Sequence, residues 1–112
     1  MIQLFGIKNC DTVKKAQAFL KQHQVAFTFV DFRDHAIDAK TLQSFVDVVG
    51  WEQLINKRST TYRNLSDAEK RDISIQLVLK KPTLIKRPVL RQGKQISVGF
   101  SEKLYAELIT NT

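Results

Sequence analysis

The first 32 residues constrain the fold of this chain more than any other segment, because strand and helix patterns alternate along them. Residues 2–6 (IQLFG) alternate in the way typical of a short strand with one buried face. From residue 11 to about residue 22 apolar residues recur at helical spacing, and residues 25–32 (VAFTFVDF) are rich in β-branched and aromatic side chains. A strand, a helix and a strand within about 30 residues predict a right-handed βαβ unit.

The junction between the first strand and this helix holds Cys10, the only cysteine of the chain. Asn9 is the predicted N-cap of the helix, and Asp11 lies in the first turn, where a carboxylate suits the helix dipole. A cysteine at a helix N-terminus, with Lys14 one turn further on, is placed where a thiolate would be stabilised. The alternative is that Cys10 is a small buried hydrophobic residue without reactivity.

The middle of the chain reads as helical. Residues 38–49 carry apolar residues on one face, Gly50 is predicted to end that helix, and residues 51–55 resume it briefly. Ser66 and Glu69 have the spacing of a capping box and predict a helix that runs to about Leu79. Pro82 is predicted to stop it.

The remaining chain predicts two more strands and a closing helix. Residues 88–90 and 95–98 flank the stretch RQGK and predict a hairpin with Gly93 in its turn. Ser101 is the predicted cap of a last helix that runs through Ile109.

Length, composition and charge set the protein class. With 112 residues, 43% of them hydrophobic and 26% charged, the chain is expected to form a single globular domain over residues 1–112. No apolar run approaches the roughly 20 residues that a membrane helix needs, and the start of the chain does not resemble a signal peptide. A lone cysteine excludes an internal disulfide framework. We therefore expect no membrane association and a cytoplasmic location.

The formal net charge of +7 favours acidic partners, such as nucleic acid, an acidic protein surface or small anions. The basic residues are spread along the chain, however, and no RNA-binding signature or zinc-finger spacing accompanies them. Nucleic acid is thus not the favoured partner. His23 and His35 lie in polar settings without a cysteine nearby, which does not favour a metal site.

Four segments, in this order and spacing, resemble the arsenate reductase (ArsC)-like family of the thioredoxin fold, which includes the Spx regulators and the YffB-like proteins. They are GIKNCDTVKKA, GWEQLINKRSTTYRNL, LIKRPVL and VGFSEKLY, and they are most similar to the YffB-like branch. The resemblance spans nearly the whole chain. It implies an α/β, thioredoxin-like fold: a four-stranded mixed sheet with flanking helices and a helical insertion over about residues 38–81.

The resemblance also implies a site. Cys10 is the expected nucleophile, with Arg58 and Arg87 as its active-site arginines. Guanidinium groups bind carboxylates and oxyanions through two parallel hydrogen bonds, which suits the two carboxylates of glutathione. Lys8, Asn9 and Lys14 are weaker candidates for the same task, as is Lys86.

Pro88 is a further expected site residue. In thioredoxin folds the proline that opens this strand is cis and lies beside the cysteine. The backbone of the preceding residue, Arg87, is then free to pair with an extended thiol substrate. The alternative is a proline that is merely tolerated at a strand start.

Two departures from the family pattern separate the subfamilies. Arsenate reductases of the family use a third arginine after the last strand, and the aligned position here is Gly99. Spx regulators typically carry Cys-x-x-Cys, and Val13 occupies the second cysteine position here. The first departure disfavours arsenate as a substrate, and the second disfavours a dithiol switch.

The predicted function is a glutathione-dependent monothiol reductase with no tightly bound cofactor. Cys10 would attack a small-molecule or protein disulfide, and glutathione or a glutaredoxin-like reductant would supply the second thiol. Two alternatives stay open. One is a regulator that docks on RNA polymerase as Spx does, and the other is an arsenate reductase with a reduced arginine set.

Overall fold

The computed structural model describes residues 2–110, and the chain divides into two compact units. The first unit combines the residues up to 31 with those from 87 onward, and the second comprises residues 32–86. Each unit is described by itself below. The single domain over residues 1–112 stays a prediction.

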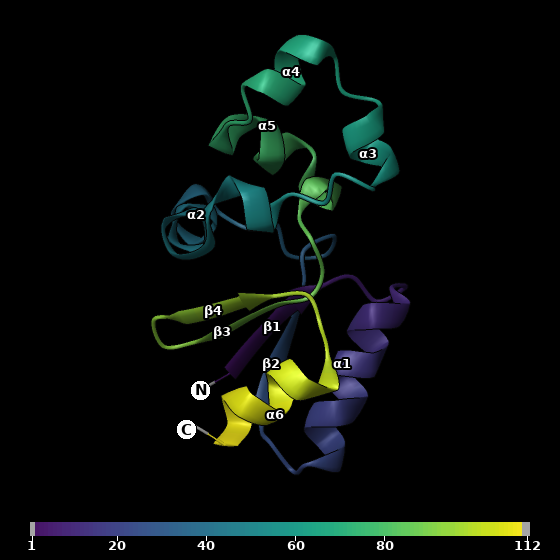
Figure 1. The fold of residues 1–112 in the computed structure, drawn as a ribbon, viewed down its shortest axis with the longest axis vertical. Coiled ribbons are helices and arrows are strands. Elements are labelled where there is room, and N and C mark those ends of the chain that lie inside the picture. Colours follow the sequence, from purple (N-terminus) through teal and green to yellow (C-terminus); the bar gives the residue numbers. More distant parts are fainter. Residues whose placement is uncertain (1, 111–112) are drawn as a thin grey trace. The chain divides into compact units, whose positions relative to one another are not determined.

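The first unit contains a four-stranded mixed sheet (Figure 1). Its strands are β1 (Ile2–Gly6), β2 (Phe27–Asp31), β3 (Val89–Gln92) and β4 (Gln95–Val98), in the spatial order β2-β1-β3-β4. β1 runs parallel to β2 and antiparallel to β3, and β3 and β4 form an antiparallel hairpin with Gly93 at φ 60° in its turn. The predicted sheet, the βαβ unit and the hairpin are thereby confirmed.

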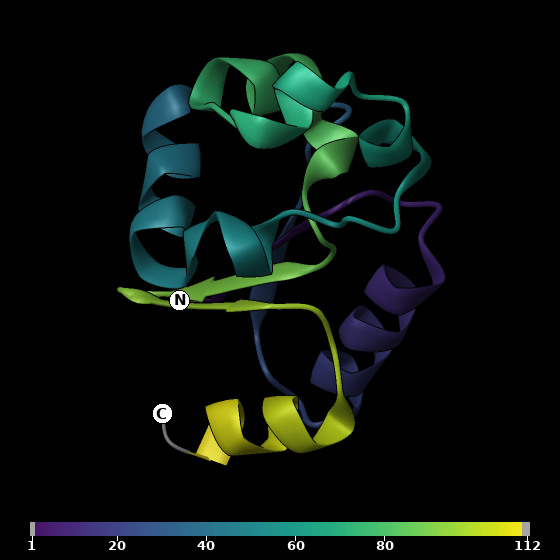
Figure 2. The ribbon, with the colours of Figure 1, turned by 45° about the horizontal axis from the view of Figure 1, so that its top comes forward.

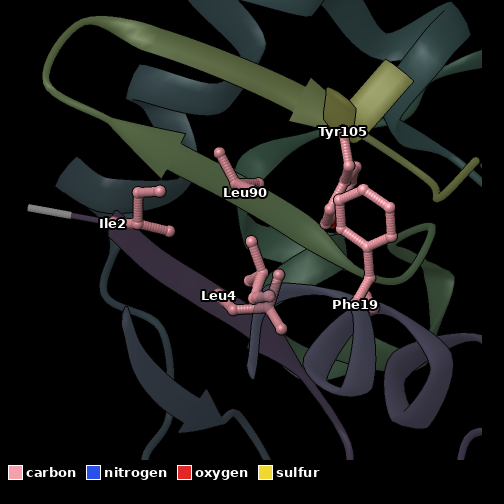
Figure 3. Packing of buried hydrophobic residues seen from close by; sticks show 7 residues of the cluster. Ile2, Leu4, Phe19, Leu90 and Tyr105 are labelled. Carbon is pink, nitrogen blue, oxygen red and sulfur yellow. The ribbon is translucent and has the colours of Figure 1, made fainter. Parts of the chain in front are cut away.

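Two helices, α1 (Asp11–Gln22) and α6 (Glu102–Thr110), cover one face of this sheet (Figures 1 and 2). Their apolar faces pack on the inward-facing residues of β1 and β3, and Figure 3 shows this cluster from close by. Its buried members are Ile2, Leu4, Ala16, Phe19, Leu20, Leu90 and Tyr105. Ser101 caps α6, as predicted, by accepting a hydrogen bond from the Leu104 N–H at 3.0 Å.

The second unit is helical. It consists of α2 (Ala39–Leu54), α3 (Thr60–Arg63), α4 (Asp67–Arg71), α5 (Ile75–Lys80) and the 3₁₀ turn η1 (Pro82–Leu84). Asp38 caps α2, and Gly50, at φ 76°, interrupts it where the sequence predicted its end. α2 packs on α5, and both α3 and α5 contact η1. Within residues 2–110, no helix is long and apolar enough to cross a membrane.

The helix predicted from Ser66 to about Leu79 is wrong in its length. The capping box forms, with Ser66 and Glu69 each accepting a hydrogen bond from the other's backbone N–H. The helix nevertheless ends at Arg71, with Asp72 as its C-cap, and Ser74 caps a separate helix by accepting from the Leu77 N–H. A second capping serine inside the apolar pattern therefore splits it into two helices.

A short antiparallel pairing ends the second unit. Ile55 forms a bridge with Ile85, the Asn56 N–H donates to the Leu84 carbonyl at 2.8 Å, and the Lys86 N–H donates to the Leu54 carbonyl at 2.7 Å. The segment that follows α2 is thus fixed to the segment that follows η1.

Candidate active site

Cys10 lies at the point where the chain leaves the sheet and enters α1. Its backbone is extended, at φ −112° and ψ 121°, and its carbonyl accepts the first helical hydrogen bond from the Lys14 N–H at 3.0 Å. Cys10 is therefore the N-cap of α1, and the prediction of Asn9 as N-cap is wrong. Asn9 lies one residue too early, in an exposed turn.

The side chain of Cys10 is a partly buried free thiol. It forms no capping hydrogen bond within the described part of the chain. The first N–H groups of a helix have no partner inside the helix, so those at the start of α1 remain available to an anion at this point. A thiolate at Cys10 would be such an anion.

A buried carboxylate holds the loop that leads to Cys10. The Lys8 backbone N–H donates to Oδ2 of Asp31 at 3.0 Å, and Asp31 is only 6% exposed. Asp31 ends β2 and lies opposite Gly6 at the end of β1. Asp31 was not among the site residues predicted from the sequence. Its one signal is an acidic residue between Val30 and Phe32 in an otherwise apolar strand pattern.

Close packing sets the distance between β1 and the first turn of α1. A Cβ atom on Gly6 would lie 2.7 Å from Cγ2 of Val13, which no real contact of this kind allows. Val13 itself is fully buried. The position at which a dithiol protein would carry its second cysteine is therefore filled here by a core residue.

Arg87 and Pro88 lie at the same edge of the sheet as the Cys10 loop. β3 starts at Val89, which lies opposite Phe5, the residue before the last of β1. The Arg87–Pro88 peptide bond is cis. The Pro88 carbonyl accepts a hydrogen bond from the Gly99 N–H at 2.8 Å, and within residues 2–110 the Arg87 backbone has no hydrogen-bond partner.

The other predicted site residues divide between the two units. Lys8, Asn9 and Lys14 belong to the first unit and have exposed side chains near Cys10 in the sequence. Arg58 belongs to the second unit, where its N–H donates to Oδ1 of Asn56 at 3.1 Å. Its part in the site stays a prediction.

Gly99 has free space beside its Cα atom, but its backbone conformation disfavours any other residue. A Cβ atom there would meet no described atom within 4 Å, but φ is +82°, in the region that favours glycine. An arginine at this position would have room for its side chain and a strained main chain. Among residues 2–110 no group of three or more histidine, cysteine, aspartate or glutamate side chains could hold a metal ion.

A four-stranded mixed sheet whose first strand leads a single cysteine to a helix N-terminus defines a thioredoxin-like protein. Residues 5–108 match the model of the ArsC family, and this chain belongs to that family. The YffB protein, a solved structure, is 40% identical with a TM-score of 0.89, over 96% of this chain and 97% of that one.

Two relatives extend the comparison. A protein of Haemophilus influenzae is 41% identical over 109 residues, which cover 94% of this chain and 96% of that protein. The global transcriptional regulator Spx of Streptococcus pyogenes serotype M1 is 33% identical over 113 residues, which cover 91% of this chain and 80% of the regulator. The resemblance to the ArsC, YffB and Spx proteins is confirmed.

Proposed function

We propose that this protein is a monothiol reductase in which Cys10 attacks a disulfide and glutathione restores the thiol. The observation that carries the proposal is the position of Cys10. It is the N-cap of α1, its side chain is not used for capping, and it is the only cysteine of the chain. The thiolate is the nucleophilic form of cysteine, and the first N–H groups of α1 are available to hydrogen-bond an anion at this point.

The reaction is a thiol–disulfide exchange. The Cys10 thiolate attacks one sulfur of the substrate disulfide, the disulfide bond breaks, and the other sulfur leaves with the bonding electrons as a thiolate. The product is a mixed disulfide on Cys10. A glutathione thiolate then attacks this bond and releases Cys10. Because Cys10 is the only cysteine of the chain, the second thiol has to come from another molecule.

Binding of glutathione is assigned to the edge of the sheet that holds Cys10. The Arg87 guanidinium can bind one carboxylate through two hydrogen bonds. Its backbone, which has no hydrogen-bond partner among residues 2–110, can form a short bridge with an extended thiol. Arg58 is proposed as the second arginine on the basis of the family resemblance. A glutaredoxin-like protein could replace glutathione as the reductant, since it delivers the same thiol chemistry.

Replacement of Cys10 tests the nucleophile. Alkylation of Cys10 with iodoacetamide is expected to abolish turnover, because the sulfur that attacks the disulfide is then blocked. Cys10→Ser is expected to abolish glutathione-dependent reduction of hydroxyethyl disulfide without changing the circular dichroism spectrum. Undiminished turnover in Cys10→Ser, or after alkylation of Cys10, would contradict the proposal.

Replacement of Arg87 tests the carboxylate contact. Charge-assisted hydrogen bonds contribute about 1.5–3 kcal/mol each, so we expect Arg87→Ala to raise the KM for glutathione roughly tenfold or more. Arg71→Ala, at the exposed end of α4, removes the same charge and is the matched control. An equal effect of both substitutions would mean that net charge alone, rather than a specific contact, sets the affinity.

Arsenate reduction is expected to be absent or far slower than disulfide reduction. Arsenate is a compact anion that needs several guanidinium donors to offset its lost hydration, and Gly99 supplies none. Gly99→Arg is expected to recover little activity, because φ of +82° strains any side chain at this position. Steady-state arsenate reduction by the wild type at the rate of its disulfide reduction would contradict this.

The identity of 33% to Spx supports a second candidate, a regulator that acts by binding RNA polymerase. In this case binding does not need the thiol. Purified polymerase retained equally by the wild type and Cys10→Ser, combined with no glutathione-dependent turnover, would favour the regulator over the reductase.

A further inference from the structure

Within residues 2–110 one charged residue is buried, and it contacts the loop that leads to the proposed nucleophile. This residue is Asp31, at the end of β2, and it is 6% exposed. Burying a charge is costly unless hydrogen bonds compensate for the lost water. The Lys8 backbone N–H donates such a bond to Oδ2 of Asp31 at 3.0 Å, and a bond to a carboxylate is stronger than one between neutral groups. Asp31 is thus joined to the chain two residues before Cys10.

The loop between β1 and α1 is short (Figure 1). It consists of Ile7, which is buried, and of Lys8 and Asn9, which form an exposed turn. Asp31 belongs to the sheet, because it pairs with Gly6 in the register of β2 against β1. The hydrogen bond from the Lys8 N–H therefore fixes an exposed turn to the sheet, just before the cysteine.

Two hydrogen bonds thus hold the backbone on either side of Cys10. On the helix side its carbonyl accepts from the Lys14 N–H at 3.0 Å, and on the sheet side the Lys8 N–H donates to Asp31. Within the described part of the chain, the Cys10 side chain forms no capping hydrogen bond. The direction in which the sulfur points therefore depends on the backbone that these two bonds hold.

We propose that Asp31 is a positioning residue for disulfide exchange, because its bond to the Lys8 N–H holds the turn that directs the Cys10 sulfur. The inference rests on the proposed function of Cys10 and adds a residue to its site. Asp31 acts through the backbone of the loop and not on the sulfur itself. Its role is to keep the sulfur aligned with a disulfide bound at the edge that carries Arg87.

This role predicts a different effect on kcat than on KM. Thiol–disulfide exchange requires the attacking sulfur at a set distance and direction from the disulfide bond, and a misplacement of about 1 Å can cost a large factor in rate. Binding of glutathione is assigned to Arg87, which the bond between Lys8 and Asp31 does not include. Loss of the bond should therefore lower kcat and leave the KM for glutathione unchanged.

Two substitutions separate the hydrogen bond from the charge. Asp31→Ala removes the acceptor, whereas Asp31→Asn removes the charge and keeps an acceptor oxygen. Leu108→Ala, at a partly buried residue of α6 that packs on the core cluster, is the control for lost stability. Urea titration gives the free energy of unfolding of each variant. Hydrogen exchange of the Lys8 amide reports whether its bond is present.

A backbone ester tests the same bond from the donor side. Replacing the amide between Ile7 and Lys8 with an ester removes the Lys8 N–H and leaves every side chain in place. Because Cys10 is the only cysteine, the full chain can be assembled by native chemical ligation of a synthetic thioester of residues 1–9 to residues 10–112. The same ligation with an ordinary amide is the control.

In Asp31→Ala and in the ester variant we expect kcat for glutathione-dependent reduction of hydroxyethyl disulfide to fall about tenfold, with an unchanged KM for glutathione. The Lys8 amide is expected to exchange faster in Asp31→Ala than in the wild type. Asp31→Asn is expected to restore both the slow exchange and most of kcat. Leu108→Ala is expected to lose stability without a loss of kcat.

An unchanged kcat in the ester variant would overturn the positioning role. Equal losses of kcat in Asp31→Asn and Asp31→Ala would overturn it too, because the charge and not the hydrogen bond would then matter, and so would an equal loss in Leu108→Ala. If Asp31→Ala does not fold, the ester variant and Asp31→Asn decide the question. No glutathione-dependent turnover in the wild type would contradict the proposed function itself, and the positioning role with it.

Discussion

Tyr105 is buried as a whole, its polar hydroxyl group as well as its ring. Its ring is fully buried against Phe19 and Phe100, but within residues 2–110 its hydroxyl group has no hydrogen-bond partner. A buried polar group without a partner costs about 1–3 kcal/mol. We expect Tyr105→Phe to raise the free energy of unfolding by about 1 kcal/mol in urea titrations. A loss of stability would show that the hydroxyl group has a partner in solution.

The same residue gives a prediction for alkaline pH. Burial raises the pKa of the Tyr105 phenol well above its usual value, because the phenolate would be desolvated. A raised pKa in the folded state contributes stability below the unfolded pKa, near 10, and this contribution is lost as pH rises above that value. The free energy of unfolding is therefore expected to fall above pH 10 more steeply in the wild type than in Tyr105→Phe. Tyr62→Phe, at a partly exposed tyrosine, is the control.

The contact between β1 and α1 determines where the cysteine lies. Because a Cβ atom on Gly6 would overlap Cγ2 of Val13, we expect Gly6→Ala to reduce the free energy of unfolding by about 1–3 kcal/mol. In a double-mutant cycle with Val13→Ala, measured by urea titration, the combined loss is expected to be smaller than the sum of the single losses. Gly93→Ala, at an open position of the hairpin turn, is expected to be additive with Val13→Ala.

Elements with local signals could be predicted from the sequence, and those that depend on distant residues could not. The first helix, the Ser66–Glu69 capping box and the hairpin are encoded by neighbouring residues. α3 is only four residues long and gives too little periodicity to detect. The break at Asp72 was missed because the apolar pattern continues across it.

The residues of the candidate site also divide into those that local sequence signals indicate and those that depend on distant residues. The position of Cys10 at a strand-to-helix junction follows from the local pattern, whereas the edge that it shares with Arg87 depends on the pairing of β1 with β3. The family resemblance implied Arg87 as a site residue, but local sequence patterns did not. Asp31 was missed because its role depends on a hydrogen bond to Lys8, 23 residues earlier in the chain. The register of β1 against β2 brings Asp31 near Lys8, and no local sequence pattern encodes that register.

At the scale of the whole molecule, the net charge of +7 is expected to select among substrates. At low ionic strength an anionic disulfide, oxidised glutathione, is expected to react with Cys10 several-fold faster than cationic cystamine, because the protein field concentrates anions. The difference between the two rates is expected to shrink at about 0.5 M salt, because screening then limits the electrostatic attraction to a few ångströms. The measurement is the exchange rate of the wild type minus the background rate found with Cys10→Ser, for each of the two disulfides. A ratio that does not change with salt would assign the preference to a specific contact.

The first unit is built from the two ends of the chain, and this has a consequence for its synthesis. β1 lies between β2, which the ribosome makes early, and β3, which it makes after the whole helical segment of residues 32–86. At about 5–20 residues per second, several seconds separate the emergence of β2 from that of β4. Throughout this interval the nascent chain displays Cys10 beside a half-built sheet, before Arg87 and Pro88 exist. The thiol is thus translated well before Arg87 and Pro88, the residues that are proposed to bind its substrate.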